Sequence, residues 1–156
     1  MQGIQFSWST MTLVAFLCAC APSPGEIPTG QVAPSPAGNW KIEFTQSGGF
    51  IGISRSVEVT SAGHFVATDK RSGTSANKEL SPEELGALSK LFSQALAAEQ
   101  PHKPSACADC YIYDLVLTSD GRSTQLHLDD TNLPKSDAEP LVTHLQQLRD
   151  SVLKSP

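Results

Sequence analysis

The sequence lacks a surplus of basic residues. Its 156 residues contain 11 Lys and Arg against 16 Asp and Glu, which gives a formal net charge of −5. Proteins that bind nucleic acid usually present a basic patch or stripe to the phosphates. This mildly acidic chain has no such stripe, which argues against a nucleic-acid partner.

Common catalytic motifs are missing as well. The patterns G-x-S-x-G, H-E-x-x-H and G-x-x-x-x-G-K do not occur, and each of them marks a well-defined reaction centre. His127 stands near Asp129 and Asp130 at a solvent-facing position of an expected strand. These residues could form an acid–base pair, but a solvated polar face is the simpler interpretation. The histidines are scattered along the chain: His64, His102, His127 and His144. We expect no catalytic site, no metal and no cofactor.

No apolar run is long enough for a membrane-spanning helix, which needs about 20 residues. The densest stretch, Met11–Ala19, has instead the length of a signal-peptide core. The residues Leu17-Cys18-Ala19-Cys20 resemble the bacterial lipobox, with Leu at −3 and a small residue at −1. This resemblance implies a signal peptide over residues 1–19 and a lipid on Cys20. Ordinary cleavage after Ala19 or Ala21 is the alternative, and the first ten residues lack the usual Lys or Arg.

The segment after the lipobox has too little apolar surface to fold. Residues 21–38 contain five prolines and three glycines, a composition that favours extended chain. Residues 20–38 therefore constitute the lipidated cysteine and a tether. The expected location is the bacterial cell envelope, with membrane contact through the lipid anchor alone. In a Gram-negative host, Ala21 in place of Asp favours the periplasmic face of the outer membrane.

Residues 39–156 are enough for one modest hydrophobic core. Apolar and polar residues alternate over 40–46 and 51–60, which predicts two strands separated by a glycine-rich break. Residues 63–69 form a weaker third candidate. The stretch 111–129 predicts a hairpin, because Asp120-Gly121 suits a type I′ turn.

Two helices follow from capping signals and apolar spacing. Ser81 and Glu84, with Pro at the first helical position, form a capping box for a helix that runs to about residue 98. Asp137 or Ser136 is expected to cap the second helix, with Pro140 in its first turn. The predicted order is β-β-(β)-α-β-β-α, an α+β domain with two helices packed on a small antiparallel sheet.

Cys107-Ala108-Asp109-Cys110 is the most conspicuous cysteine motif. In an exported protein with Cys20 lipidated, these two are the remaining thiols of the mature chain and can pair as a disulfide. A redox role would need a lowered thiolate pKa, which Asp109 between the thiols disfavours. Zinc would need two further ligands. A disulfide is the preferred interpretation, and redox and metal roles stay open.

Several segments together resemble the emfourin-like family. The stretch IEFTQSGGFIGISRSVEV, residues 42–59, is similar to the opening of these proteins, where a strand leads into a Gly-Gly-Phe step. The leucine-rich stretch 80–96 and the strand that contains Asp109, Tyr111 and Tyr113 follow in the family's order. The resemblance covers about residues 41–149.

Emfourin itself is a protein inhibitor of thermolysin-like zinc metalloproteases, so the resemblance implies a secreted or periplasmic metalloprotease as partner. An inhibitor needs a rigid loop that fills the cleft, and preorganisation lowers the entropy cost of binding. Phe50 between glycines is the candidate anchor; the alternative is that Gly48 and Gly49 form a bulge and Phe50 lies in the core. The candidate contact residues are Ser47, Gly48, Gly49, Phe50 and Ile51.

Two other functions stay open at this point. One is a non-enzymatic binding or structural lipoprotein of the envelope with another partner. The second is a thiol oxidoreductase that works through Cys107 and Cys110. Inhibition of a metalloprotease or reduction of an insulin disulfide would separate these from the inhibitor.

Overall fold

The computed structural model describes residues 38–97 and 107–154, all of which belong to one compact unit. The expected signal peptide, Cys20 and the tether up to residue 37 lie outside the described residues. No helix in the described part of the chain is both long enough and apolar enough to cross a membrane.

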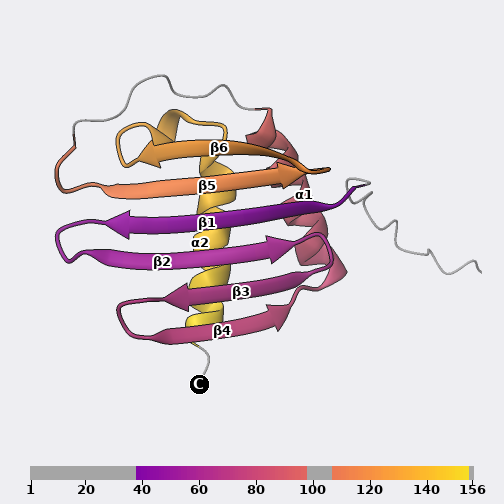
Figure 1. Cartoon of the computed structure of the whole chain (residues 1–156), viewed down its shortest axis with the longest axis horizontal. Coiled ribbons are helices and arrows are strands. Elements are labelled where there is room, and N and C mark those ends of the chain that lie inside the picture. Colours follow the sequence, from indigo (N-terminus) through magenta and orange to yellow (C-terminus); the bar gives the residue numbers. More distant parts are fainter. Residues whose placement is uncertain (1–37, 98–106, 155–156) are drawn as a thin grey trace, which may run out of the picture. The chain divides into compact units, whose positions relative to one another are not determined.

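The described residues form a six-stranded sheet in the order β4-β3-β2-β1-β5-β6 (Figure 1). Every neighbouring pair is antiparallel. The first strand in the sequence therefore lies in the middle of the sheet, between β2 and β5. The strands are β1 Trp40–Gly48, β2 Ile53–Thr60, β3 His64–Asp69, β4 Thr74–Glu79, β5 Tyr111–Ser119 and β6 Arg122–Asp129.

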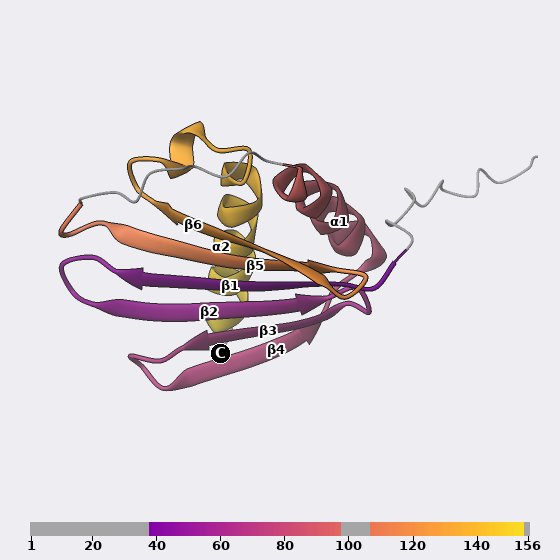
Figure 2. The same cartoon turned by 45° about the horizontal axis from the view of Figure 1, so that its top comes forward.

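Both helices cover one face of this sheet (Figure 2). The helix α1, Pro82–Leu96, follows β4, and α2, Glu139–Leu153, follows β6 after the short 3₁₀ helix η1, Leu133–Lys135. In Figures 1 and 2, α1 lies near the end of the sheet opposite to the turn between β1 and β2. The other face of the sheet carries the polar residues of the alternating pattern.

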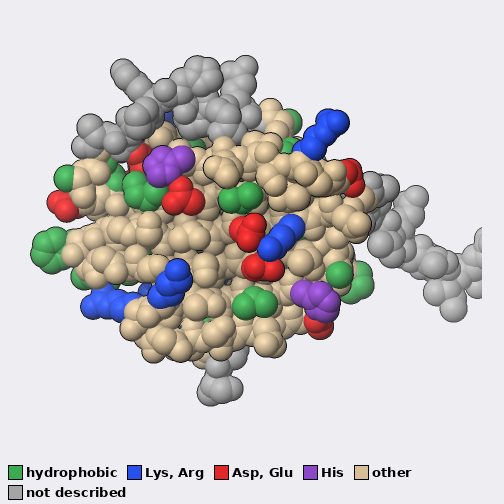
Figure 3. All heavy atoms as spheres, viewed as in Figure 1, with side chains coloured by type: hydrophobic (Ala, Val, Ile, Leu, Met, Phe, Trp, Pro, Cys, Tyr) green, Lys and Arg blue, Asp and Glu red, His purple; other side chains and the backbone are tan. Residues whose placement is uncertain are grey.

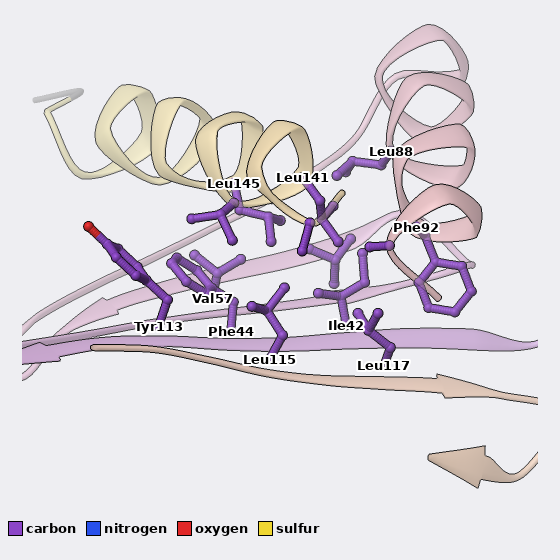
Figure 4. Close-up of a cluster of buried hydrophobic side chains, with 14 of the residues drawn as sticks. Ile42, Phe44, Val57, Leu88, Phe92, Tyr113, Leu115, Leu117, Leu141 and Leu145 are labelled. Atoms are coloured by element: carbon purple, nitrogen blue, oxygen red, sulfur yellow. The ribbon is translucent and has the colours of Figure 1, made fainter. Parts of the chain in front are cut away.

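The hydrophobic core lies between the sheet and the helices (Figure 4). The register of β1 places Phe44 opposite Val57 on β2 and Leu115 on β5, so alternate positions of three strands point to the same side. Leu141 on α2 and Leu88 on α1 close this layer from above (Figure 4). The alternation seen in the sequence thus becomes one continuous apolar layer.

Local signals in the sequence correctly predicted the start of α1 and the β5–β6 turn. Ser81 Oγ accepts a hydrogen bond from Glu84 N at 3.2 Å, and Ser81 N donates to Glu84 Oε2 at 2.9 Å. These two bonds are the expected capping box. Asp120 and Gly121 have φ of 47° and 79°, as a type I′ turn requires at both central positions.

Two expectations need correction. The strand β4 was not predicted, because Thr74–Glu79 is polar and largely exposed and shows no apolar alternation; it forms because the edge of β3 offers backbone partners. The predicted cap of α2 at Asp137 or Ser136 is wrong, since the N-cap is Ala138. A further turn follows the 3₁₀ helix, in which Glu139 N donates to Ser136 O at 3.1 Å. The helix therefore starts after Ser136 and Asp137.

Candidate functional site

The turn between β1 and β2 presents the most exposed large hydrophobic side chain among the described residues. We call Gly49–Gly52 the tip. Gly48 pairs with Ile53 at its base, and Gly52 N donates to Gly49 O at 3.0 Å across it. Phe50 is 93% exposed and Ile51 57% exposed. The alternative interpretation of Phe50 as a core residue is therefore wrong.

Glycine is required at the base of the tip because the start of β5 approaches closely. Gly48 and Gly49 have φ of +86° and +70°, values that L side chains rarely adopt. A Cβ on Gly49 would lie 2.3 Å from Cε1 of Tyr111, and one on Gly48 would lie 2.7 Å from the carbonyl oxygen of Cys110. The same carbonyl accepts a hydrogen bond from Gly49 N at 3.1 Å. The first residue of the tip is thus fixed against β5.

The turn between β3 and β4 holds the tip from the other side. Nη1 of Arg71 donates to the carbonyl oxygen of Ile51 at 3.0 Å. Asp69 fixes this second turn: its Oδ1 accepts from Arg71 N at 3.0 Å, and its Oδ2 accepts from Arg55 Nε at 2.9 Å. The guanidinium of Arg55 lowers the pKa of Asp69 below its ordinary value. No local signal in the sequence marks Arg71, because its contact with Ile51 joins residues of two different hairpins.

The cysteine pair lies directly behind the tip. Cys107 and Cys110 form a disulfide just before β5, and Cys110 supplies the carbonyl that binds Gly49. The preferred sequence-based interpretation of this motif therefore agrees with the structure. It also places the disulfide next to the candidate contact residues, which the sequence did not indicate.

Asp130 holds the beginning of β5 in place. Its Oδ2 accepts from Tyr111 N and its Oδ1 accepts from the hydroxyl of Tyr113, both at 2.8 Å. Burial, followed by this hydrogen bond to the carboxylate, raises the pKa of Tyr113 well above its ordinary value. Asp130 thus fixes Tyr111, against whose ring Gly49 packs. No local signal in the sequence indicates this role.

His127 lies on the open face of the sheet, as its position in the strand predicts, but its partner differs from its sequence neighbours. Its Nδ1 lies 2.6 Å from Oδ1 of Asp114 on β5, and both side chains are about half exposed or more. Asp129 is buried and accepts a hydrogen bond from Thr131 instead.

Within residues 38–97 and 107–154, no three His, Cys, Asp or Glu side chains are grouped so that they could hold a metal ion.

The candidate site is therefore an exposed apolar projection with a fixed backbone. It consists of two exposed apolar side chains on a short turn. The backbone of this turn is hydrogen bonded to Cys110, just before β5, on one side and to Arg71 on the other. Figure 3 shows hydrophobic side chains at this end of the sheet and basic ones beside them. Such a rigid projection suits insertion into a cleft of another protein.

Comparison with known proteins identifies a family. The model of the family described as Emfourin matches residues 44–146, which is well over half of the chain and includes the tip, the starts of both helices and the cysteine motif. Neither the curated proteins nor the solved structures contain a match.

Proposed function

Since the chain belongs to the emfourin family, we propose that it inhibits thermolysin-like zinc metalloproteases by placing the tip, Gly49–Gly52, in the active-site cleft. Family membership supports a protease-inhibitor role in general. The choice of target class follows from the activity of emfourin itself, and the choice of the tip follows from the geometry of this chain.

The observation that carries the proposal is the exposure of Phe50 on a backbone that is already fixed. A side chain of this size loses about 1.5–3 kcal/mol of favourable free energy when it stays in water, so its 93% exposure needs a reason. Thermolysin-like clefts accept apolar side chains. An inhibitor whose loop is ordered before binding loses less conformational entropy in the complex.

The proposed location is the cell envelope, with the chain anchored by a lipid on Cys20. The support is the lipobox-like Leu17-Cys18-Ala19-Cys20. Two or three acyl chains on one cysteine give lasting attachment at about 0.8 kcal/mol per buried CH₂, whereas one chain is marginal. An anchored inhibitor would protect envelope proteins from proteases that are secreted through or into this space.

Inhibition can be tested with the Phe50→Ala variant of the full chain in detergent, with thermolysin and related enzymes as probes. Truncating an anchor at the centre of an interface typically costs at least about 2 kcal/mol, a loss of roughly 30-fold in affinity. We expect that loss in the inhibition constant together with an unchanged thermal midpoint, because Phe50 contributes nothing to the core.

Val66→Ala is the matched control, because Val66 is also an exposed large hydrophobic residue but lies on β3 outside the tip. It should inhibit like the wild type. If the wild-type chain leaves all these proteases fully active, the inhibitor proposal is wrong, and an envelope lipoprotein with a different binding partner replaces it.

Lipidation can be tested by metabolic labelling with palmitate in a bacterial host. Cys20→Ala should lose the label and leave the detergent phase, whereas Cys18→Ala should keep both properties, because Cys18 leaves with the signal peptide. The reverse result would contradict the assignment of Cys20.

A further inference from the structure

The β3–β4 turn, Asp69–Gly73, lies beside the tip and carries two exposed cations, Lys70 and Arg71. Its backbone is fixed: Lys70 N donates to Ser54 O at 2.9 Å, and Asp69 Oδ1 accepts from Arg71 N. The turn and the tip are therefore parts of one ordered surface at the same end of the sheet (Figure 1).

The charge on this side of the tip is positive. Arg55 and Asp69 form an ion pair and neutralise each other, which leaves the charges of Lys70 and Arg71. Among the described residues, no carboxylate lies within ion-pair distance of either of these two side chains. This patch is notable in a chain whose formal net charge is −5.

The other side of the tip carries two exposed carboxylates. Asp109 is exposed in the disulfide segment and Asp130 follows β6. Asp130 is engaged with Tyr111 and Tyr113, but both carboxylates lie on the β5–β6 side. Two exposed cations thus lie on the β3–β4 side of Phe50, and two exposed carboxylates lie on its β5–β6 side.

We propose that the β3–β4 turn is the second part of the binding surface, with two roles. Arg71 is a positioning residue that holds the carbonyl of Ile51 and thereby the direction in which Phe50 projects. Lys70 and Arg71 together select a partner with an acidic rim on one side of its cleft. This inference rests on the proposed inhibitor function and specifies which proteases of that class bind.

The two roles affect different rate constants. Charges at the rim of an interface act mainly on association, and their effect weakens as salt screens them. A hydrogen bond that fixes the anchor turn acts on the lifetime of the complex, because a turn freed from Arg71 releases Phe50 more readily. The Arg71→Lys variant retains the charge but loses the planar guanidinium that reaches Ile51.

The experiment measures association and dissociation rates of the full chain on immobilised thermolysin at about 0.01 M and about 0.15 M ionic strength, between which the Debye length falls from about 30 to about 8 Å. Lys70→Ala should slow association about threefold at low salt and leave dissociation unchanged. Arg71→Ala should slow association similarly and speed dissociation about three- to tenfold. Arg71→Lys should restore the association rate without restoring the dissociation rate.

Lys90→Ala is the control, since Lys90 is an exposed lysine on α1, which lies near the other end of the sheet. It changes the net charge equally and should leave both rates unchanged. Thermal midpoints close to the wild type show that all variants are folded.

The inference is overturned if Lys70→Ala associates like the wild type at low salt, or if Arg71→Ala dissociates like the wild type. It is also overturned if Arg71→Lys and Arg71→Ala behave alike in both rates. Any of these three outcomes is compatible with the inhibitor function, provided that the wild-type chain binds the protease and Phe50→Ala does not. Absence of binding by the wild-type chain overturns the function and the inference together.

Discussion

At the scale of single residues, the glycines around Phe50 differ in what they do. Gly49 packs on the ring of Tyr111, so that an added Cβ would overlap it at 2.3 Å. Gly52 closes the same turn with φ of +61°, but nothing lies within 4 Å of the position of its Cβ. Gly49 therefore combines a backbone requirement with a steric one, whereas Gly52 has the backbone requirement alone.

Alanine substitutions separate these two requirements. Gly52→Ala should lower the free energy of unfolding by about 1–2 kcal/mol, the cost of a left-handed backbone for an L residue. Gly49→Ala should lose that amount and a further overpacking cost of about 1–3 kcal/mol, because the Tyr111 ring must move. Denaturant unfolding of the two variants measures the difference. Equal losses would mean that the ring yields freely and that the contact does not fix the tip.

At the scale of elements, the start of α1 depends on an ion pair as well as on its capping box. Lys78 Nζ on β4 lies 2.7 Å from Glu84 Oε1, and Glu84 Oε2 accepts from Ser81 N. The hydrogen bond from Lys78 is the main reason that the pKa of Glu84 is lowered from its ordinary value, and the bond from Ser81 is the next. The edge strand β4 is thereby connected to the helix that follows it.

This lowered pKa predicts a pH dependence of stability. Ionised Glu84 favours the folded chain, so its contribution is complete above the ordinary glutamate pKa of about 4.3 and is lost as pH falls through the lower folded value. Glu84→Gln should be less stable than the wild type at neutral pH by up to about 1 kcal/mol, since the pair is partly exposed. The difference should vanish in acid.

Glu83→Gln is the control for this comparison. Glu83 lies in the same first turn and is exposed, so its substitution removes the same charge near the helix N-terminus. Urea unfolding at several pH values should show a smaller and flatter difference for Glu83→Gln. Identical pH profiles for the two variants would assign the effect to the helix dipole instead of the Lys78–Glu84 pair.

At the scale of the whole molecule, one core joins the described elements, apart from the polar edge strand β4. The buried cluster extends from Trp40 on β1, which stacks on Phe92 of α1, to Leu148 on α2. Arg149 on α2 adds a buried hydrogen bond from Nη1 to Gln46 Oε1 at 2.7 Å, across a sequence separation of 103 residues. These contacts all join residues within 39–156.

Residues 39–156 should consequently fold without the preceding segment. We expect a single cooperative thermal transition, with a midpoint close to that of the full chain, because residues 21–38 have little apolar surface to contribute. Calorimetry on the shortened chain and on the full chain in the same detergent makes the comparison. A broad, non-cooperative transition in the shortened chain would show that the core needs the segment before it.

The sequence by itself determined the features whose causes are local. The capping box of Ser81 and Glu84 spans one helical turn, the Asp120-Gly121 turn spans two residues, and alternation in β1 and β2 shows directly which side chains are buried. Each of these depends on residues a few positions apart. The order of the predicted elements and the resemblance to the emfourin family followed from them.

The tertiary structure alone decided that Phe50, in the candidate contact segment, is exposed and not part of the core. A phenylalanine is expected inside a protein. Phe50 projects outward because both of its neighbours are held by other parts of the chain. Gly49 is hydrogen bonded to Cys110, and Ile51 is hydrogen bonded to Arg71. The partner of His127 and the strand β4 were likewise set by neighbours across the sheet. Such pairings depend on strand order and register, which local propensity does not encode because they join residues distant in sequence.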